Sequence, residues 1–315
     1  MGWVGDLVPL AFIWKYPHTK LSKRYLKTLR SNRQTIRYFV NSLLLLPLML
    51  FNFFSTDHAV SRKPERTVVF VHIPKAAGSS FTAFLQTHFP KNVSLVNTYW
   101  EILRKQPLVD LSQYRLITGH FGFNLTNALN APFVITLLRD PVDRACSTYE
   151  YLRAYYQKHP AVTFGDPDIA EIARQWKVAV NQPFEHFFES ELPVVRASVF
   201  DNPQARQLAL DSPYELTDLS SSLLRQIALS RLPKIDVLGC QEDFDATITV
   251  TCQRLGWSLP RSLTCPRTNA TPADALVVRR SLSSTLRRKI EHRAEIDMEL
   301  HALARERLRE DHRQT

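Results

Sequence analysis

The chain has 315 residues, of which 44% are hydrophobic and 22% charged. This balance is ordinary for a globular protein and excludes global disorder. Only 8 residues are glycine, which excludes a collagen or a Gly-rich linker array. The four cysteines form no Cys-x-x-Cys pair, so no structural zinc site is expected, while a disulfide such as Cys252–Cys265 stays open.

The formal charge of +10 is concentrated near the N-terminus. Residues 1–66 carry 11 Lys or Arg against 3 Asp or Glu, a net of +8, whereas residues 67–315 carry 29 against 27, a net of +2. A domain that binds nucleic acid concentrates positive charge on its folded surface. We therefore expect no nucleic-acid partner, and we divide the chain into an N-terminal segment, 1–66, and a folded domain, 67–315.

The N-terminal segment is typical of targeting or membrane attachment. Eight basic residues and no acidic one lie from Lys15 to Arg37, ahead of an apolar run over 39–54. A spanning helix needs roughly 20 residues, more than this run offers, and the positive-inside rule leaves residues 1–37 cytosolic. Three interpretations stay open: a short type II anchor, an interfacial amphipathic helix, or a poorly chosen start codon. We expect membrane association, in the Golgi if the source is eukaryotic, and a cytoplasmic protein if the run does not insert.

Apolar, β-branched runs predict three buried parallel strands, over 67–71, 133–138 and 235–238. Helical patterns follow them, over 81–85, from 142 to about 156, and from 243 towards 255. Residues 168–232 are expected to be mainly helical, and 283–311 to form one long charged helix. Strands that alternate with helices predict an α/β fold with a mostly parallel sheet covered on both faces.

The loop after the first strand, His72–Phe81, is predicted to bind an anion. Its sequence, His-Ile-Pro-Lys-Ala-Ala-Gly-Ser-Ser-Phe, joins a strand to a helix through small residues. The N–H groups of a helix's first turn converge where the helix dipole favours negative charge. Lys75 adds a cation, and Ser79 or Ser80 is expected to cap the helix. The loop is not a Walker A motif, because Lys75 precedes Gly78 instead of following it.

A second anion-binding element is predicted where the second strand ends. Arg139 stands at the carboxyl end of that strand, where open α/β sheets bind ligands. Ser147 lies two helical turns further along the chain. A guanidinium fork and a hydroxyl together suit one phosphate. For the Lys75 loop, the alternative is an ordinary strand–turn–helix with a solvated lysine.

Together these motifs resemble the sulfotransferases that use 3′-phosphoadenosine 5′-phosphosulfate, and most of all the carbohydrate branch that includes the heparan 2-O-sulfotransferases. The paired sequences are His72-Ile-Pro-Lys-Ala-Ala-Gly-Ser-Ser and Leu-Leu-Arg139-Asp-Pro-Val-Asp-Arg-x-x-Ser147. Asn202-Pro-Gln-Ala-Arg-Gln-Leu, Val237-Leu-Gly with Glu242-Asp-Phe, and Leu255-Gly-Trp are similar as well, in the expected order. The resemblance covers roughly residues 67–310.

The resemblance implies a P-loop NTPase-like, three-layer α/β/α fold and a nucleotide donor bound without a metal. The residues implied for the 5′-phosphosulfate are Lys75, Ala76, Ala77, Gly78, Ser79 and Ser80, and those for the 3′-phosphate are Arg139 and Ser147. Ala76-Ala77-Gly78-Ser79 stands where Thr-Gly-Gly-Thr is common in the family. The loop therefore has one glycine and one hydroxyl fewer than is common, which affects its detailed geometry and not the expected class of protein.

Sulfuryl transfer needs a base for the acceptor hydroxyl and a cation near the leaving oxygen. Lys75 suits the second role. His120 follows a short β-like run between the two motifs, and the family has a catalytic histidine in a comparable segment, so His120 is the predicted base. The alternatives are a buried structural His120 and Glu101 as the base. His72 is expected to be structural.

Several nearby residues fit structural roles as well as functional ones. Arg206 fits an ion pair as well as an acceptor contact, and Glu242 fits the organisation of a loop. The tyrosines after Ser147 are expected in the core or on a helix surface, with an acceptor cleft as the alternative; they are Tyr149, Tyr151, Tyr155 and Tyr156.

The expected activity is metal-free transfer of a sulfuryl group from 3′-phosphoadenosine 5′-phosphosulfate to a hydroxyl, with a carbohydrate as the favoured acceptor. One rival is a small-molecule kinase of related fold, which needs a Walker lysine and a magnesium-binding carboxylate. The other is a membrane-tethered nucleotide-binding protein without turnover.

Overall fold

The computed structural model describes residues 66–105, 110–260, 278 and 281–314. All of them belong to Ser61–Thr315, one of two compact units into which the chain divides. The basic segment, the apolar run over 39–54 and Cys265 lie outside the described residues. Among the helices of the described part, none has the length and apolar character needed to cross a bilayer.

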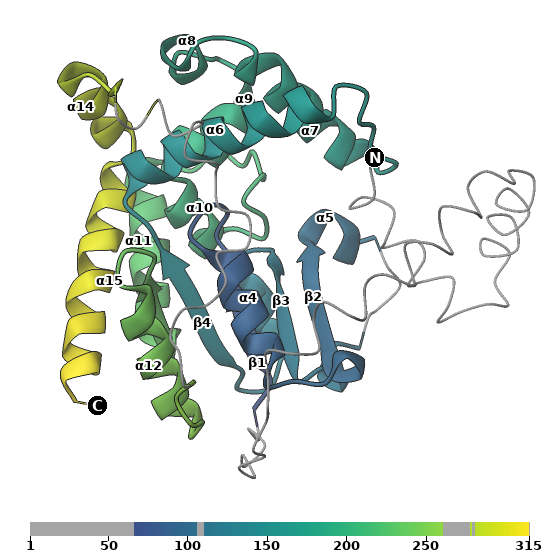
Figure 1. The fold of residues 1–315 in the computed structure, drawn as a ribbon, viewed down its shortest axis with the longest axis vertical. Coiled ribbons are helices and arrows are strands. Elements are labelled where there is room, and N and C mark those ends of the chain that lie inside the picture. Colours follow the sequence, from purple (N-terminus) through teal and green to yellow (C-terminus); the bar gives the residue numbers. More distant parts are fainter. Residues whose placement is uncertain (1–65, 106–109, 261–277, 279–280, 315) are drawn as a thin grey trace, which may run out of the picture. The chain divides into compact units, whose positions relative to one another are not determined.

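Five strands form one sheet in which every neighbouring pair is parallel (Figure 1). In sheet order they are β2 (Ser94–Tyr99), β3 (Leu116–His120), β1 (Val68–Val71), β4 (Phe133–Leu138) and β5 (Val237–Cys240). All four residues of β1 are 0% exposed. A strand that is buried on both faces gains most from bulky β-branched side chains, which explains the run Val-Val-Phe-Val at the centre.

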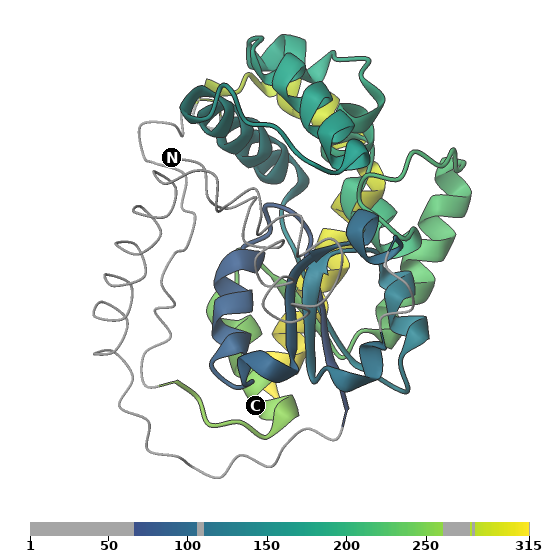
Figure 2. The same ribbon diagram turned by 90° about the vertical axis from the view of Figure 1, so that its right-hand side faces the viewer.

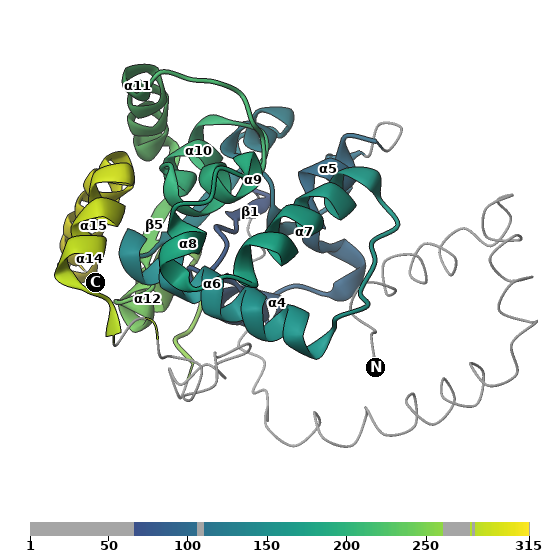
Figure 3. The same cartoon turned by 90° about the horizontal axis from the view of Figure 1, so that it is seen from above.

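Helices cover both faces of the sheet (Figures 2 and 3). One face carries α4 (Gly78–Gln86) and α12 (Phe244–Leu255), and the other carries α10 (Pro203–Ala209) and α11 (Ser221–Arg231). The long helix α15 (Glu295–Arg313) lies along β5. The predicted three-layer α/β/α fold is therefore confirmed, with an all-parallel sheet in place of a mostly parallel one.

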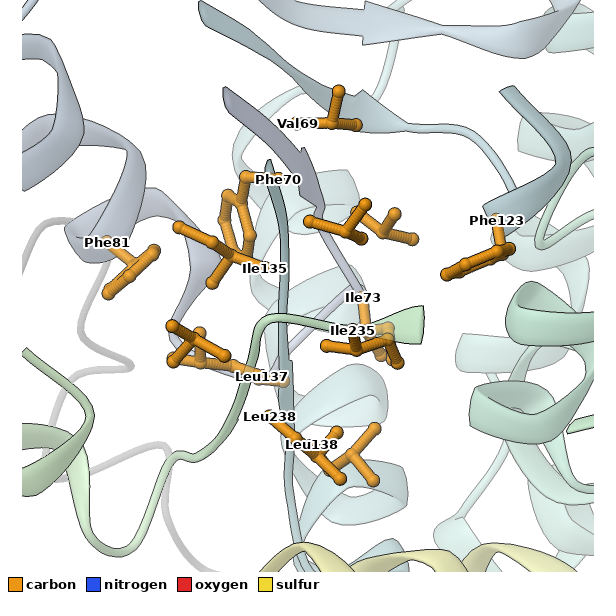
Figure 4. Packing of buried hydrophobic residues seen from close by; sticks show 14 of the residues in the cluster. Val69, Phe70, Ile73, Phe81, Phe123, Ile135, Leu137, Leu138, Ile235 and Leu238 are labelled. Atoms are coloured by element: carbon orange, nitrogen blue, oxygen red, sulfur yellow. The ribbon is translucent and has the colours of Figure 1, made fainter. Parts of the chain in front are cut away.

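The main core fills the space between the sheet and these helices (Figure 4). Phe70 of β1 packs edge-on against Phe81 of α4, with ring centroids 5.0 Å apart. Ile135 and Leu137 of β4 are buried in the same cluster. Burial of these apolar side chains holds α4 against the strand that precedes it, and so fixes the loop between them.

A second core lies among helices gathered beyond the carboxyl ends of the strands (Figure 1). The helices are α6 (Pro141–Lys158), α7 (Pro167–Val180), α8 (Phe184–Phe188), α9 (Pro193–Val195), the π-helix Arg196–Phe200 and α14 (Ser284–Arg293). Tyr149, Phe187 and Phe200 are at its centre, with Phe187 and Phe200 rings 5.3 Å apart. The remaining elements are α5 (Trp100–Leu103) and short 3₁₀ turns at Lys91–Val93, Leu111–Gln113, Phe123–Ala128 and Leu232–Lys234.

Two predicted elements are wrong in detail. The single helix over 283–311 is two helices, α14 and α15, separated at Ala294 (φ −108°, ψ 30°). The break arises because the side chain of Asn202 accepts hydrogen bonds from the N–H groups of Ile296 and Asp297, at 2.8 and 3.1 Å. The third predicted strand, 235–238, begins instead at Val237 and continues through Gly239 to Cys240.

Candidate active site

The two predicted anion-binding elements meet at the carboxyl ends of neighbouring strands. The Lys75 loop follows β1 and Arg139 follows β4, and these strands are hydrogen-bonded side by side. The Nη1 atom of Arg139 donates to the main-chain oxygen of Lys75 at 2.9 Å. Two segments that are 64 residues apart in the chain therefore contact each other at one site.

Backbone geometry shapes the Lys75 loop. Lys75 and Ala77 have positive φ angles, 67° and 61°, on either side of the fully buried Ala76. A left-handed non-glycine residue costs roughly 1–2 kcal/mol and is typical of ligand-binding turns. Ala77 stands where the resembled family commonly has glycine, and it adopts the conformation that glycine favours.

The predicted serine cap of the following helix is wrong. Helix α4 begins at Gly78, its N-cap residue is Ala77, and no side chain caps it. The left-handed turn at Ala77 starts the helix earlier than expected, so Ser79 and Ser80 lie inside its first turn. Their hydroxyls thus stand at the end of the helix where its dipole attracts an anion.

Gly78 allows the first turn of α4 to approach His72. A Cβ on Gly78 would lie 1.9 Å from Cδ2 of His72, so no larger residue fits without movement. The His72 ring stacks on Phe70 at 5.5 Å and contacts the His120 ring at 4.5 Å. Burial, followed by the charges of His120 and Lys75, lowers the pKa of His72 well below its usual value. His72 is thus a neutral, tightly packed side chain beside the site.

His120 is the last residue of β3 and lies beside Tyr99 at the end of β2. Their rings stack at 5.2 Å with an interplanar angle of 13°. Gly119 permits this approach, because a Cβ there would lie 2.1 Å from the carbonyl oxygen of Thr98. The Nδ1 atom of His120 is buried and has no hydrogen-bond partner among the described residues.

Burial controls the protonation of His120 and Lys75. Burial first, and the charge of Lys75 second, lower the pKa of His120 to about 4. For Lys75, burial and then Arg139 lower the pKa to about 8, while Glu150 opposes them. The Lys75 ammonium lies 3.8 Å above the ring of Tyr151. Near neutral pH the imidazole is therefore neutral, and most of the lysine is charged.

Side chains from distant segments hold the Arg139 loop. Gln204 accepts from the N–H of Arg139 at 3.0 Å and donates to its carbonyl at 2.8 Å, as a neighbouring strand would. Glu242 accepts from the N–H of Asp140 at 2.9 Å, and its other oxygen lies 3.1 Å from Nε2 of His301. Glu242 thus organises this loop.

Helix α10 also binds the strand ends on the histidine side. Gln207 is fully buried and donates to the carbonyls of His72 and Phe121, both at 3.0 Å. Arg206 donates to the main-chain carbonyls of Glu215 and Thr217, so these hydrogen bonds are structural and are not an ion pair. The Asn-x-Gln-x-Arg element, which the sequence singled out, therefore joins the two halves of the site.

Helices α10 and α15 cap each other at their N-termini. Asn202 accepts from the first N–H groups of α15, as described above, and Asp297 accepts from the N–H groups of Gln204 and Ala205 at 3.1 and 2.8 Å. Asp297 is 0% exposed, and burial raises its pKa to about 6 against the opposing charge of Arg144. This reciprocal pair fixes Gln204, and through it the main chain of Arg139. Sequence reasoning missed Asp297, because nothing local marks it.

The two remaining predicted residues, Ser147 and Glu101, lie in helices α6 and α5. Ser147 is 8% exposed on α6. Glu101 is 6% exposed and accepts a hydrogen bond from the hydroxyl of Ser212. Burial raises the pKa of Glu101, and Ser212 and Arg104 partly offset this effect.

The structure and the comparisons add two plain findings. Among the described residues, no group of three or more His, Cys, Asp and Glu side chains is placed to hold a metal ion. No family model matches the chain, and a search of curated proteins finds no match.

Proposed function

We propose that this protein transfers a sulfuryl group from 3′-phosphoadenosine 5′-phosphosulfate to a hydroxyl group, with a carbohydrate as the favoured acceptor. One observation carries the proposal: the Arg139 guanidinium donates to the Lys75 carbonyl at 2.9 Å. Each motif alone suits many strand–turn–helix units. A ligand with two separate anionic groups requires both motifs at one place, and they meet at the carboxyl ends of two neighbouring parallel strands.

The donor's two anionic ends would be held by different loops. The start of α4, with Lys75, Ala76, Ala77, Gly78, Ser79 and Ser80, would hold the 5′-phosphosulfate through main-chain N–H groups, hydroxyls and one ammonium. Arg139 and Ser147 would hold the 3′-phosphate. The small residues of the loop support this fit, because they let an anion approach the backbone closely.

The protonation states support the chemistry. In the transfer, a bond forms between the acceptor oxygen and sulfur, while the bond from sulfur to the bridging oxygen breaks. The electron pair of the broken bond stays on the phosphate, and His120 takes the hydroxyl proton. The lowered pKa keeps the imidazole neutral and able to accept that proton, and it also makes His120 a weaker base than an ordinary histidine. The Lys75 ammonium would stabilise the charge that develops on the leaving phosphate.

The test is transfer of radiolabelled sulfate from the donor by the full chain to a panel of glycans, with release of 3′-phosphoadenosine 5′-phosphate measured in parallel. We expect label in an acceptor and equal release of the bisphosphate. A kinase would instead transfer the γ-phosphoryl group of ATP to the acceptor and would require magnesium. A binding protein without turnover would bind the donor and release nothing, and either result would overturn the proposal.

A further inference from the structure

The two ends of Lys75 are held by the chain segment that begins at Arg139. The main-chain oxygen of Lys75 accepts a hydrogen bond from Nη1 of Arg139 at 2.9 Å. Its ammonium lies 3.8 Å from the centroid of the Tyr151 ring, and Tyr151 belongs to helix α6, which starts two residues after Arg139. The side chain of Lys75 therefore depends on α6, although its backbone is shaped locally.

The Tyr151 ring holds the ammonium without neutralising it. Among the residues that the structure describes, no carboxylate forms an ion pair with Lys75. Glu150 favours the charged lysine through its own charge, whereas burial and Arg139 oppose it. An ammonium over an aromatic face is attracted by the negative face of the ring. Because the ring carries no net charge, the cation remains available to an anion.

The other titratable groups beside Lys75 are neutral near pH 7. Burial is the main cause that lowers the pKa of His72 well below its usual value and that of His120 to about 4. Burial, followed by Tyr155, raises the pKa of the Tyr151 phenol. Arg139 and Glu150 are thus the charged groups that act on the lysine, with opposite signs. The ring adds to the effect of Glu150.

One face of α6 serves both predicted anion sites. Ser147 and Tyr151 are four residues apart on this helix, so they share a face. Ser147 is assigned to the 3′-phosphate, and Tyr151 contacts the lysine that is assigned to the leaving phosphate. Tyr151 is 38% exposed, so packing of the core does not explain an aromatic residue at this position.

We propose that Tyr151 is a positioning residue for Lys75, whose ring orders the ammonium beside the anion-binding loop, as a charged group without a counter-ion, before the donor binds. A side chain that is ordered in advance loses less conformational entropy when its ligand arrives. This inference rests on the proposed function and adds to it a residue that prepares the donor site.

The experiment measures the affinity of the full chain for 3′-phosphoadenosine 5′-phosphate by calorimetry, from about pH 6.5 to about pH 9.5. Tyr151→Leu removes the ring but leaves an apolar side chain over the lysine. We expect the affinity near neutral pH to fall about 2- to 10-fold, because Lys75 must then be ordered on binding. The alkaline decrease in affinity should move to lower pH by about 0.5–1.5 pH units, because the ring no longer favours the charged form.

Two further variants separate the ring from the hydroxyl and from the packing of α6. Tyr151→Phe keeps the ring, so its affinity should stay within about two-fold of wild type, with the wild-type pH dependence. Tyr155→Leu is the matched control, because Tyr155 lies one turn further on α6 and its ring stacks on Tyr151 and not on Lys75. This control should leave the alkaline decrease where it is in wild type.

A fluorinated ring tests the same contact without a change of shape. Fluorine withdraws electrons from the ring face that attracts a cation. Phenylalanine with one and then three ring fluorines at position 151 should therefore lower the affinity stepwise from that of Tyr151→Phe. This series decides the question even if Tyr151→Leu does not fold, which the melting temperature shows.

The outcomes separate this inference from the function beneath it. An unchanged affinity and pH dependence in Tyr151→Leu would overturn the inference, as would equal effects of Tyr151→Leu and Tyr151→Phe. The same alkaline shift in Tyr155→Leu, or no effect of fluorination, would overturn it as well. Each of these results leaves the sulfotransferase proposal standing. Failure of the wild-type chain to bind the bisphosphate overturns the proposed function, and this inference with it.

Discussion

The two loops that meet at the candidate site are held in opposite ways. The Lys75 loop is shaped by its own backbone, with positive φ angles at Lys75 and Ala77 and a helix that begins at the next residue. The Arg139 loop is held from outside, by Gln204 and Glu242, from 65 and 102 residues away. A loop of the first kind can be identified from local sequence. A loop of the second kind depends on side chains that only the fold brings near.

The largest expected effect concerns His120, which stands beside the locally shaped loop. His120→Ala should lower kcat by about 10²–10⁴, with donor affinity unchanged. Because burial and Lys75 hold the pKa of His120 at about 4 in the free protein, the kcat/KM of the wild type should fall only as the pH approaches that value, well below the usual ~6.5.

The pH dependence of kcat/KM in wild type and variant checks this, with the melting temperature measured at each pH as the control for acid unfolding. A variant with near-normal kcat, or a wild-type acid limb at the usual histidine value, would move the base role elsewhere. Glu101→Gln would then be the next variant to measure.

Lys75→Ala should lower kcat by about 10²–10³, because it removes the cation at the leaving group. The melting temperature should change little, since the ammonium of the half-buried Lys75 contacts Tyr151, whereas its partial burial, which lowers its pKa, opposes this. Lys91→Ala removes an exposed lysine from the 3₁₀ turn at Lys91–Val93 and serves as the control. Turnover within a few-fold of wild type would exclude Lys75 from the reaction.

Gln204→Leu tests the distant support of the Arg139 loop. The substitution keeps the size of the side chain but leaves the N–H and the carbonyl of Arg139 without the partner they share. We expect the free energy of unfolding to fall by about 2–4 kcal/mol. Denaturant unfolding measures this, beside Gln253→Leu at an exposed position of α12. Equal losses in the two variants would mean that Gln204 does not support the loop.

Arg139→Ala and Ser147→Ala should weaken binding of 3′-phosphoadenosine 5′-phosphate by about 1.5–3 kcal/mol each. Adenosine 5′-phosphate lacks the 3′-phosphate, so its affinity should change little in Ser147→Ala and less than that of the bisphosphate in Arg139→Ala, which also loses the hydrogen bond to the Lys75 carbonyl. Calorimetry with both nucleotides gives the comparison, and the monophosphate is the internal control. Equal losses for the two nucleotides would contradict the assignment of these residues to the 3′-phosphate.

The smallest expected effect is a gain. Ala77→Gly should relieve the left-handed strain at the N-cap of α4. The added freedom of the unfolded chain offsets part of this stabilisation, so the free energy of unfolding should rise by about 0.5 kcal/mol. Ala83→Gly, inside the same helix, should instead cost about 1 kcal/mol. Chemical denaturation of both variants decides. A loss at Ala77 similar to that at Ala83 would mean that the loop is not strained.

Sequence patterns identified the elements whose character is local. The runs around Val68–Val71 and Phe133–Leu138 are buried on both faces, so their composition alone marks them as strands. Strand β2, Ser94–Tyr99, lies at the sheet edge and is only half-buried. Its mixture of polar and apolar residues gave no such signal.

Sequence analysis singled out Glu242 and the element that begins at Asn202, but their partners could not be predicted, because they depend on tertiary contacts. The charged pattern over 283–311 predicts one helix, and the break at Ala294 exists because Asn202 caps α15 from more than ninety residues away. Tyr99 lies beside His120 through strand pairing, and Asp297 reaches α10 across the fold. The chemistry-bearing residues were accessible to sequence analysis, whereas the contacts through which Gln204, Glu242 and Asp297 position them were not.

The central claim is that the Lys75 and Arg139 loops form one nucleotide donor site. Calorimetric titration of the wild-type chain with 3′-phosphoadenosine 5′-phosphate and with adenosine 5′-phosphate tests it most directly. The account predicts one bound bisphosphate, with at least about 10-fold higher affinity than the monophosphate. It also predicts an affinity that falls as the pH rises above the Lys75 pKa of about 8, where the free protein loses that cation. Equal affinity for the two nucleotides, or no binding of either, would contradict the claim.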